Sequence, residues 1–292
     1  MSDFLEQVIA ERRADVAREK ATVSEEELLA SAKENVLSRG TGGGVRAWRP
    51  GWDGFSAALR VRPWGQIAVI AEVKRVSPAL GVLDEDVDPA TLALWYMAAG
   101  ATAISVLTEP RHWGGSLEDL AAVRDAVPSL PILCKDVIVD EYQIVQARAA
   151  GADAVLLIAE VLSDDELKHF IDRANRLGMG VLLEAHEPVA FGRAVATGTA
   201  IVGVNARNLR RPDEIDIGRV RQLHTFVRDH QVLVAESGIT SVEDVRMLPA
   251  RVAAVLIGSA LMLADDPAPL IQGILSIHRE PLAAKAATRR RS

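Results

Sequence analysis

The sequence is poor in cysteine and has no long apolar run, and each shortage excludes a class of protein. Its 292 residues include one cysteine, Cys134, so no internal disulfide can form, which favours a reducing compartment. No stretch of about 18 apolar residues is available to span a bilayer, and the N-terminus lacks the pattern of a secretory signal. We therefore expect a cytoplasmic protein with no membrane partner.

Positive charge is also in short supply. The 33 Lys and Arg residues are outnumbered by 40 Asp and Glu residues, which gives a net charge of −7. A protein that grips nucleic acid needs an extended basic face, so the composition argues against a nucleic-acid partner. A local cationic pocket for an anionic small molecule is compatible with this charge.

Two further sites are not predicted. No group of Cys, His and carboxylate residues has the spacing of metal ligands, so we infer no metal. The glycine-rich segment 39–46 has neither the preceding strand nor the following helix of a phosphate-binding loop, so it is interpreted as an ordinary loop.

Apolar residues make up 49% of the chain, enough for a large core, and the stretch Gln66–Pro78 shows how it is used. This stretch has the apolar, partly β-branched composition of a buried strand, yet it carries Glu72 and Lys74. Side chains alternate across a strand, so these two charges share one face. Buried charges must pair or act on a ligand, and the pattern alone leaves both readings open.

From Gln66 onward, strand patterns alternate regularly with helical patterns. The expected strands are Gln66–Lys74, Ala101–Leu107, Pro131–Lys135, Ala152–Ile158, Gly180–Glu184, Ala200–Asn205, Gln231–Glu236 and Ala253–Ile257. The expected helices are Pro89–Ala99, Leu117–Val127, Asp140–Ala150, Ser163–Leu177, Glu187–Thr197, Asp216–Asp229, Ser241–Leu248 and Pro267–His278. Eight such pairs predict an α/β fold, the (β/α)8 TIM barrel. A doubly wound open sheet is the alternative, but eight even units without a dinucleotide-binding fingerprint favour the closed barrel.

The predicted domain organisation is a single domain over residues 1–280. Residues 1–60 form an extra N-terminal helical segment, with helices expected over Ser2–Lys20 and from Ser24 to about Leu37, and a short helix near Phe55. Residues 66–280 form the barrel, and residues 281–292 are expected to be a disordered tail.

Polar residues follow nearly every expected strand at its carboxyl end, the face where such barrels carry their active sites. These residues are Glu72, Lys74, Ser77, Thr108, Glu109, Lys135, Asp136, Glu184, His186, Asn205, Arg207, Glu236, Ser237, Gly238, Gly258 and Ser259. Two lysines among several carboxylates suit acid–base chemistry on an anionic substrate, although a lysine there could also form a Schiff base. Cys134 is expected to face the helices as a core residue, and His186 to be a loop residue.

The pairs Ser237-Gly238 and Gly258-Ser259 each stand before a helical segment. Loops after the last two strands are the usual phosphate site of these barrels, and glycine lets backbone N–H groups approach an anion. Two ordinary tight turns would give the same pattern. With Arg207 and Lys74 on the same face, a phosphosugar ligand is favoured.

These motifs together resemble the indole-3-glycerol phosphate synthase family. The matching segments are Ile70–Pro78, Ser105–Glu109, Gly114–Glu118, Leu133–Asp136, Leu183–His186, Gly203–Leu209, Ala235–Ile239 and Leu256–Ser259, in family order across Phe4–Leu275. The resemblance implies a lyase of tryptophan biosynthesis. It would cyclise 1-(2-carboxyphenylamino)-1-deoxyribulose 5-phosphate with loss of CO2 and water, without a cofactor, as a monomer or weak homo-oligomer.

The resemblance also implies residue roles. Lys135 would be the general acid of ring closure. Glu184 would act in the proton transfers of dehydration, oriented by Asn205. Lys74 would meet the anionic groups of the substrate, positioned by Glu72. The implied substrate-binding residues are Ser77, Pro78, Trp113, Arg207, Glu236, Ser237, Gly238, Gly258 and Ser259.

The sequence departs from the family pattern at three positions. Ala79 replaces the second serine of a Ser-Pro-Ser motif, Val137 stands where phenylalanine is usual, and Trp113 also replaces a phenylalanine. These changes leave open a paralogue with altered substrate preference. A different phosphosugar enzyme, such as an isomerase or aldolase, and a non-catalytic phosphosugar-binding barrel also stay open, although no acid–base residue is lost.

Overall fold

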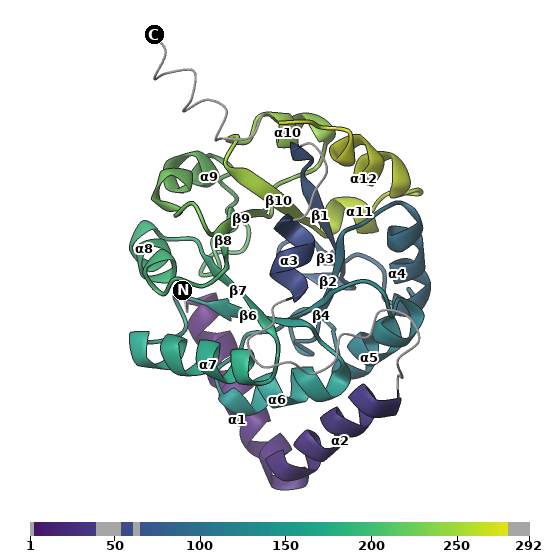
Figure 1. Cartoon of the computed structure of the whole chain (residues 1–292), viewed down its shortest axis with the longest axis vertical. Helices are drawn as coiled ribbons and strands as arrows, with labels where there is room; N and C mark the ends of the chain where they lie inside the picture. The colour runs from purple at the N-terminus through teal and green to yellow at the C-terminus, as the bar shows by residue number, and fades with distance from the viewer. Residues whose placement is uncertain (1–2, 39–53, 61–64, 280–292) are drawn as a thin grey trace.

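The structure, a computed structural model, describes residues 3–38, 54–60 and 65–279 (Figure 1). The loop expected over residues 39–46 and the tail expected over 281–292 lie outside this part of the chain. None of the helices that the described residues form is both long and apolar enough to cross a membrane.

Within the described residues, eight parallel strands close into a barrel in the order β1-β10-β9-β8-β7-β6-β5-β4. They are β1 (Ala68–Val73), β4 (Ala103–Leu107), β5 (Ile132–Lys135), β6 (Ala154–Ile158), β7 (Gly180–Ala185), β8 (Ile201–Asn205), β9 (Val232–Glu236) and β10 (Val252–Ile257). The predicted (β/α)8 barrel is confirmed, with every expected strand found at its expected place.

The helices surround this barrel as an outer ring (Figure 1). They are α4 (Pro89–Ala98), α5 (Leu117–Ala126), α6 (Glu141–Ala150), α7 (Asp164–Arg176), α8 (Pro188–Ala196), α9 (Gly218–Leu223), α10 (Val242–Arg246), α11 (Ser259–Met262) and α12 (Ala268–Leu275). The helix expected over Asp216–Asp229 is shorter than predicted, because α9 gives way to a 3-10 turn, His224–Phe226. The sequence also did not predict the hairpin of β2 (Val76–Ser77) and β3 (Gly81–Val82), in which Gly81, the first residue after the turn, has φ +75°.

Local signals explain where the helices begin and end. The Ser163 hydroxyl accepts from the Glu166 backbone N–H, and the Glu166 carboxylate accepts from the Ser163 backbone N–H, which closes a capping box at the start of α7. At the end of α6, Gly151 adopts φ +105°, a left-handed conformation that glycine takes without strain.

Strand alternation divides the apolar residues into two layers. Inside the barrel, Ala68 and Ile70 of β1 belong to one buried cluster, whereas Val69 and its outward-facing neighbours pack against the helices in another. Cys134 lies in the outer layer, as predicted, where burial raises the pKa of its thiol to about 12. Cys134 is therefore a buried core residue whose thiol is hard to ionise.

The described helices of the N-terminal segment pack on the outside of the barrel and at one of its ends. Helices α1 (Phe4–Thr22) and α2 (Glu25–Ser38) run along the outside beside α6 (Figure 1), while α3 (Gly54–Arg60) packs against the starts of the strands. Arg12 of α1 donates from Nε and Nη2 to the two carboxylate oxygens of Asp136, at 3.1 and 2.9 Å. Both residues are buried, so this ion pair fastens α1 to the residue that follows Lys135.

The Arg12–Asp136 pair gives a stability prediction. We expect Arg12→Ala to lower the free energy of unfolding by about 3–5 kcal/mol, because it leaves the Asp136 carboxylate buried without its counter-charge. Urea unfolding measures this. The control is Arg18→Ala, which removes a mostly exposed arginine from the same helix and should cost about 1 kcal/mol or less. Equal losses in the two variants would mean that the buried pair does not anchor α1.

Candidate active site

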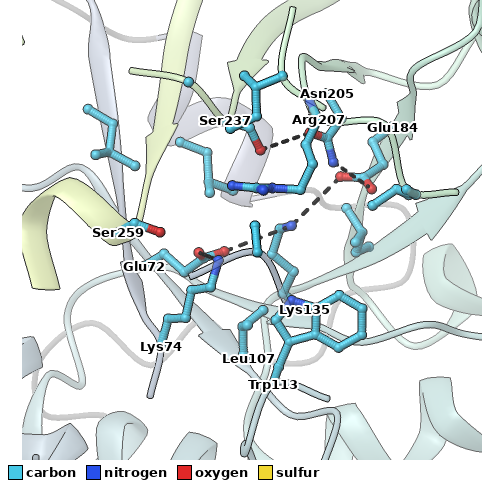
Figure 2. A pocket seen from close by; sticks show the side chains of 18 of the residues that line it. Glu72, Lys74, Leu107, Trp113, Lys135, Glu184, Asn205, Arg207, Ser237 and Ser259 are labelled. Atoms are coloured by element: carbon cyan, nitrogen blue, oxygen red, sulfur yellow. Dashed lines mark hydrogen bonds and ion pairs between the residues drawn. The ribbon is translucent and has the colours of Figure 1, made fainter. Parts of the chain in front are cut away.

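A cavity of about 410 Å³ opens at the carboxyl ends of the barrel strands, and Lys135 projects into it (Figure 2). The predicted residues that line it are Glu72, Lys74, Trp113, Lys135, Glu184, Asn205, Arg207, Ser237, Gly238, Gly258 and Ser259. The size is that of a small-molecule site. Polar residues from strands far apart in the sequence therefore meet at one place, as their positions predicted.

Lys135 stands at the centre of a ring of three carboxylates. Its Nζ lies 3.8 Å from one oxygen of each, namely Glu72 Oε1, Glu184 Oε2 and Glu236 Oε2. The four side chains come from β1, β5, β7 and β9, which are alternate strands of the barrel. Alternate strands supply one layer of side chains in such barrels, so the ring is the uppermost layer, here built of charged groups.

Burial and the neighbouring charges both shift the pKa values of the groups in this layer. Burial lowers the pKa of Lys135, but the negative charges of the three glutamates outweigh it and raise that pKa above the ordinary value for lysine. Burial, followed by the charge of Glu184, raises the pKa of Glu236 well above the ordinary value for glutamate. The lysine is thus held as an ammonium ion, and its charge partly offsets the rise in the pKa of Glu236.

A chain of hydrogen bonds orients Glu184. Asn205 Oδ1 accepts from the Ser237 hydroxyl at 2.8 Å and from the Arg207 backbone N–H at 3.0 Å. Since both bonds need the amide oxygen, the amide nitrogen faces Glu184 and donates to its Oε1 at 3.3 Å (Figure 2). Asn205 and Glu184 are thus hydrogen-bonded, as the predicted orientation of Glu184 by Asn205 requires. Ser237, which donates to the Asn205 oxygen, has φ +66°.

Two cationic side chains border the same cavity. Lys74 Nζ lies 3.8 Å from Glu72 Oε2, and burial lowers the pKa of Lys74 although the Glu72 charge opposes this. Burial likewise lowers the pKa of Arg207, whose guanidinium donates to the Pro212 carbonyl. Both groups are largely withdrawn from water, which strengthens their attraction for an anion.

Three predicted residues lie behind the cavity wall. Glu236 is 1% exposed and sits beneath the lining, and neither Ser77 nor Pro78 reaches it. Ser77 is fully buried in the β2–β3 hairpin, and the next residues along that hairpin, Ala79 and Leu80, line the cavity instead.

Residues that the sequence did not assign to the site form much of its apolar wall. Phe4 and Leu5 of α1 line the cavity, and the Phe4 ring meets the Trp113 ring edge-on with centroids 6.0 Å apart. The Glu109 carboxylate accepts from the backbone N–H groups of His112 at 2.6 Å and Trp113 at 3.1 Å, which fixes the loop that carries the indole. Its place just after a strand and in the matching segment Ser105–Glu109 drew attention to Glu109, but neither signal assigned it this role.

Comparison with known proteins identifies the family. Residues 5–274 match the family model for indole-3-glycerol phosphate synthase. The chain belongs to this family. It is 41% identical over 264 residues to the indole-3-glycerol phosphate synthase of Rhodopirellula baltica, which covers 90% of this chain and 95% of that protein. It is 53% identical over 203 residues to that of a Nocardioides species, covering 68% and 76%.

Solved structures show the same fold at a greater distance. A 3-hexulose-6-phosphate synthase aligns with 72% of this chain and 99% of its own, with a TM-score of 0.57 and 16% sequence identity. At that identity the likeness supports the barrel fold alone.

In this synthase family member, the two altered aromatic positions face one cavity. Trp113 and Val137 both line it, and both pack on the inner apolar cluster. A larger side chain at one position and a smaller one at the other conserve volume, which packed sites tolerate best.

We therefore expect Val137→Phe alone to overpack the cavity and weaken substrate binding, and Trp113→Phe in the same protein to restore much of the loss. A double-mutant cycle on KM measures the coupling. Simple additivity of the two effects would mean that the side chains do not share a substrate pocket.

Proposed function

We propose that the chain cyclises 1-(2-carboxyphenylamino)-1-deoxyribulose 5-phosphate to indole-3-glycerol phosphate in tryptophan biosynthesis, with loss of CO2 and water. Membership of the family supports this reaction. The observation in the structure that carries it is the Lys135 ammonium, held among three buried carboxylates in a cavity of small-molecule size.

Lys135 acts in the ring closure. The aromatic carbon that bears the carboxylate attacks the ketone carbon, and the carbonyl electrons move to oxygen. Lys135 donates its proton to that oxygen, which removes the charge that would otherwise develop there. The carboxylate then leaves as CO2, and the electrons of the broken bond return to the aromatic ring.

Glu184 acts in the dehydration that follows. The new hydroxyl leaves as water, pushed out by the nitrogen electrons, and a proton is lost from the methylene carbon beside the nitrogen as the indole double bond forms. Glu184 takes part in these proton transfers, and the amide of Asn205 keeps its carboxylate aligned. No cofactor is required in this scheme because the aromatic amine supplies the electrons.

The anionic groups of the substrate are held by the cationic side of the cavity. Lys74 and Arg207 provide the charge, and Ser237, Gly238, Gly258 and Ser259 surround the phosphate. Substitutions of the two glycines would test this arrangement poorly, because any side chain there would collide with the protein itself. A Cβ at Gly238 would lie 2.8 Å from Ile215 Cγ2 on a backbone at φ +74°, and a Cβ at Gly258 would lie 2.2 Å from Glu72 Oε2.

Ser259→Asp is a cleaner test of the phosphate position. We expect it to raise KM roughly tenfold or more, because a carboxylate a few ångströms from the phosphate repels it through a medium of low polarity. Ser276→Asp, at the exposed end of α12, adds the same net charge away from the cavity and should leave KM unchanged. Equal KM values in the two variants would place the phosphate elsewhere.

The reaction itself is tested with purified protein and the carboxyphenylamino sugar phosphate, followed by the fluorescence of the indole formed. A steady increase that requires the protein is expected. Binding of the substrate without any indole would instead identify a non-catalytic phosphosugar-binding barrel.

A further inference from the structure

The charged layer at the top of the barrel places three glutamates around Lys135. Glu184 of β7 and Glu236 of β9 are separated by one strand, β8, whose inward-facing residue opposite Glu184 is Gly203. A barrel of eight strands has an interior just wide enough to be filled by side chains. Two carboxylates can approach Lys135 there only if the strand between them leaves room.

Gly203 leaves that room. A Cβ built on it would lie 2.1 Å from Glu236 Oε1, far inside van der Waals contact, and 3.3 Å from Glu184 Cβ. The Glu236 carboxyl thus occupies the space that any other residue at position 203 would fill with its own side chain. In the same way, a Cβ built on Gly258 would lie 2.2 Å from Glu72 Oε2.

Backbone conformation does not explain this glycine. Gly203 lies within β8, and its φ is outside the positive range that other residues avoid. Glycine inside a strand weakens it and commonly marks a place where another group approaches closely. Here the group that approaches is the carboxyl of Glu236.

We propose that Gly203 is a positioning residue for the reaction: its missing side chain forms the seat that holds the Glu236 carboxyl within ion-pair distance of Lys135. The inference rests on the proposed function and assigns a role to a residue that touches no substrate. With any side chain at 203, Glu236 must move away from Lys135, and the ammonium loses one of the three carboxyl groups around it.

The test is a cycle of Gly203→Ala, Glu236→Ala and the double variant, assayed by indole formation. We expect Gly203→Ala to lower kcat roughly 10²-fold with little change in KM, the usual effect of a group misplaced by about 1 Å. If Gly203 acts through Glu236, the double variant should be no slower than Glu236→Ala alone. Gly192→Ala in α8 is the matched control, since a Cβ there meets nothing within 4 Å, and its kcat should match the wild-type value.

A wild-type kcat in Gly203→Ala, or losses that multiply in the double variant, would overturn the proposal. If Gly203→Ala fails to fold, folding of the double variant supports the seat, and failure of both variants contradicts it. If the wild-type protein forms no indole, the proposed function fails, but a crystal structure of Gly203→Ala still tests the seat. Glu236 must then lie farther from Lys135 than in the wild type, and an unmoved Glu236 refutes the role.

Discussion

Replacing Lys135 with methionine is expected to lower kcat by roughly 10²–10⁴, the usual worth of a positioned acid. That loss corresponds to about 3–5 kcal/mol of activation free energy. Methionine keeps most of the length of the side chain but cannot donate a proton to the ketone oxygen. No other ammonium group lies within ion-pair distance of both Glu184 and Glu236 among the residues that the structure describes.

The same substitution should also lower the free energy of unfolding, because three buried carboxylates lose their shared counter-charge. Circular dichroism must therefore confirm that the assayed protein is folded. Lys168→Met, at an exposed position on α7, is the control and should retain full activity. Turnover close to wild type in folded Lys135→Met would remove Lys135 from the mechanism.

Glu184→Gln is the second substitution for which we expect near-complete loss of turnover. Glutamine preserves the shape and still offers an oxygen to the Asn205 amide, so the architecture of the site should persist. It cannot carry the protons of the dehydration step. We expect kcat to fall by roughly 10²–10⁴ and KM to change much less.

Glu187→Gln is the matched control for this position. Glu187 lies three residues farther along, with a side chain 51% exposed, and its substitution should leave both constants unchanged. A raised KM with an unchanged kcat in Glu184→Gln would instead make Glu184 a recognition residue.

Much of this site followed from the sequence because parallel strands end on the same face of a barrel. Once the alternation of strands and helices was recognised, Glu72, Lys135 and Glu184 had to converge, although they are far apart in the chain. The family resemblance added roles to residues whose position was already fixed by topology. Strand periodicity alone placed Cys134 away from the cavity, where the structure has it.

The parts that the sequence did not predict depend on contacts between distant segments. The apolar pattern of α1 indicated a helix but not that Phe4 and Leu5 would line the cavity. That placement depends on contacts with distant residues, among them the Arg12–Asp136 ion pair, which joins residues 124 positions apart, and the bond from the Phe4 backbone N–H to the Arg210 carbonyl. The close approach of Glu72 to Gly258 likewise cannot be predicted from the sequence, because it depends on the pairing of β1 with β10.

Following the carboxylate of the substrate is the most direct test of Lys135 as the acid of ring closure. Substrate labelled with ¹³C in its carboxyl group is incubated with wild-type protein and with folded Lys135→Met, and the labelled CO2 and the indole product are measured together. We expect equal amounts of CO2 and indole-3-glycerol phosphate from the wild type, and almost none of either from the variant. Release of both products at the same rate by the two proteins would contradict the assignment of ring closure to Lys135 and its three carboxylates.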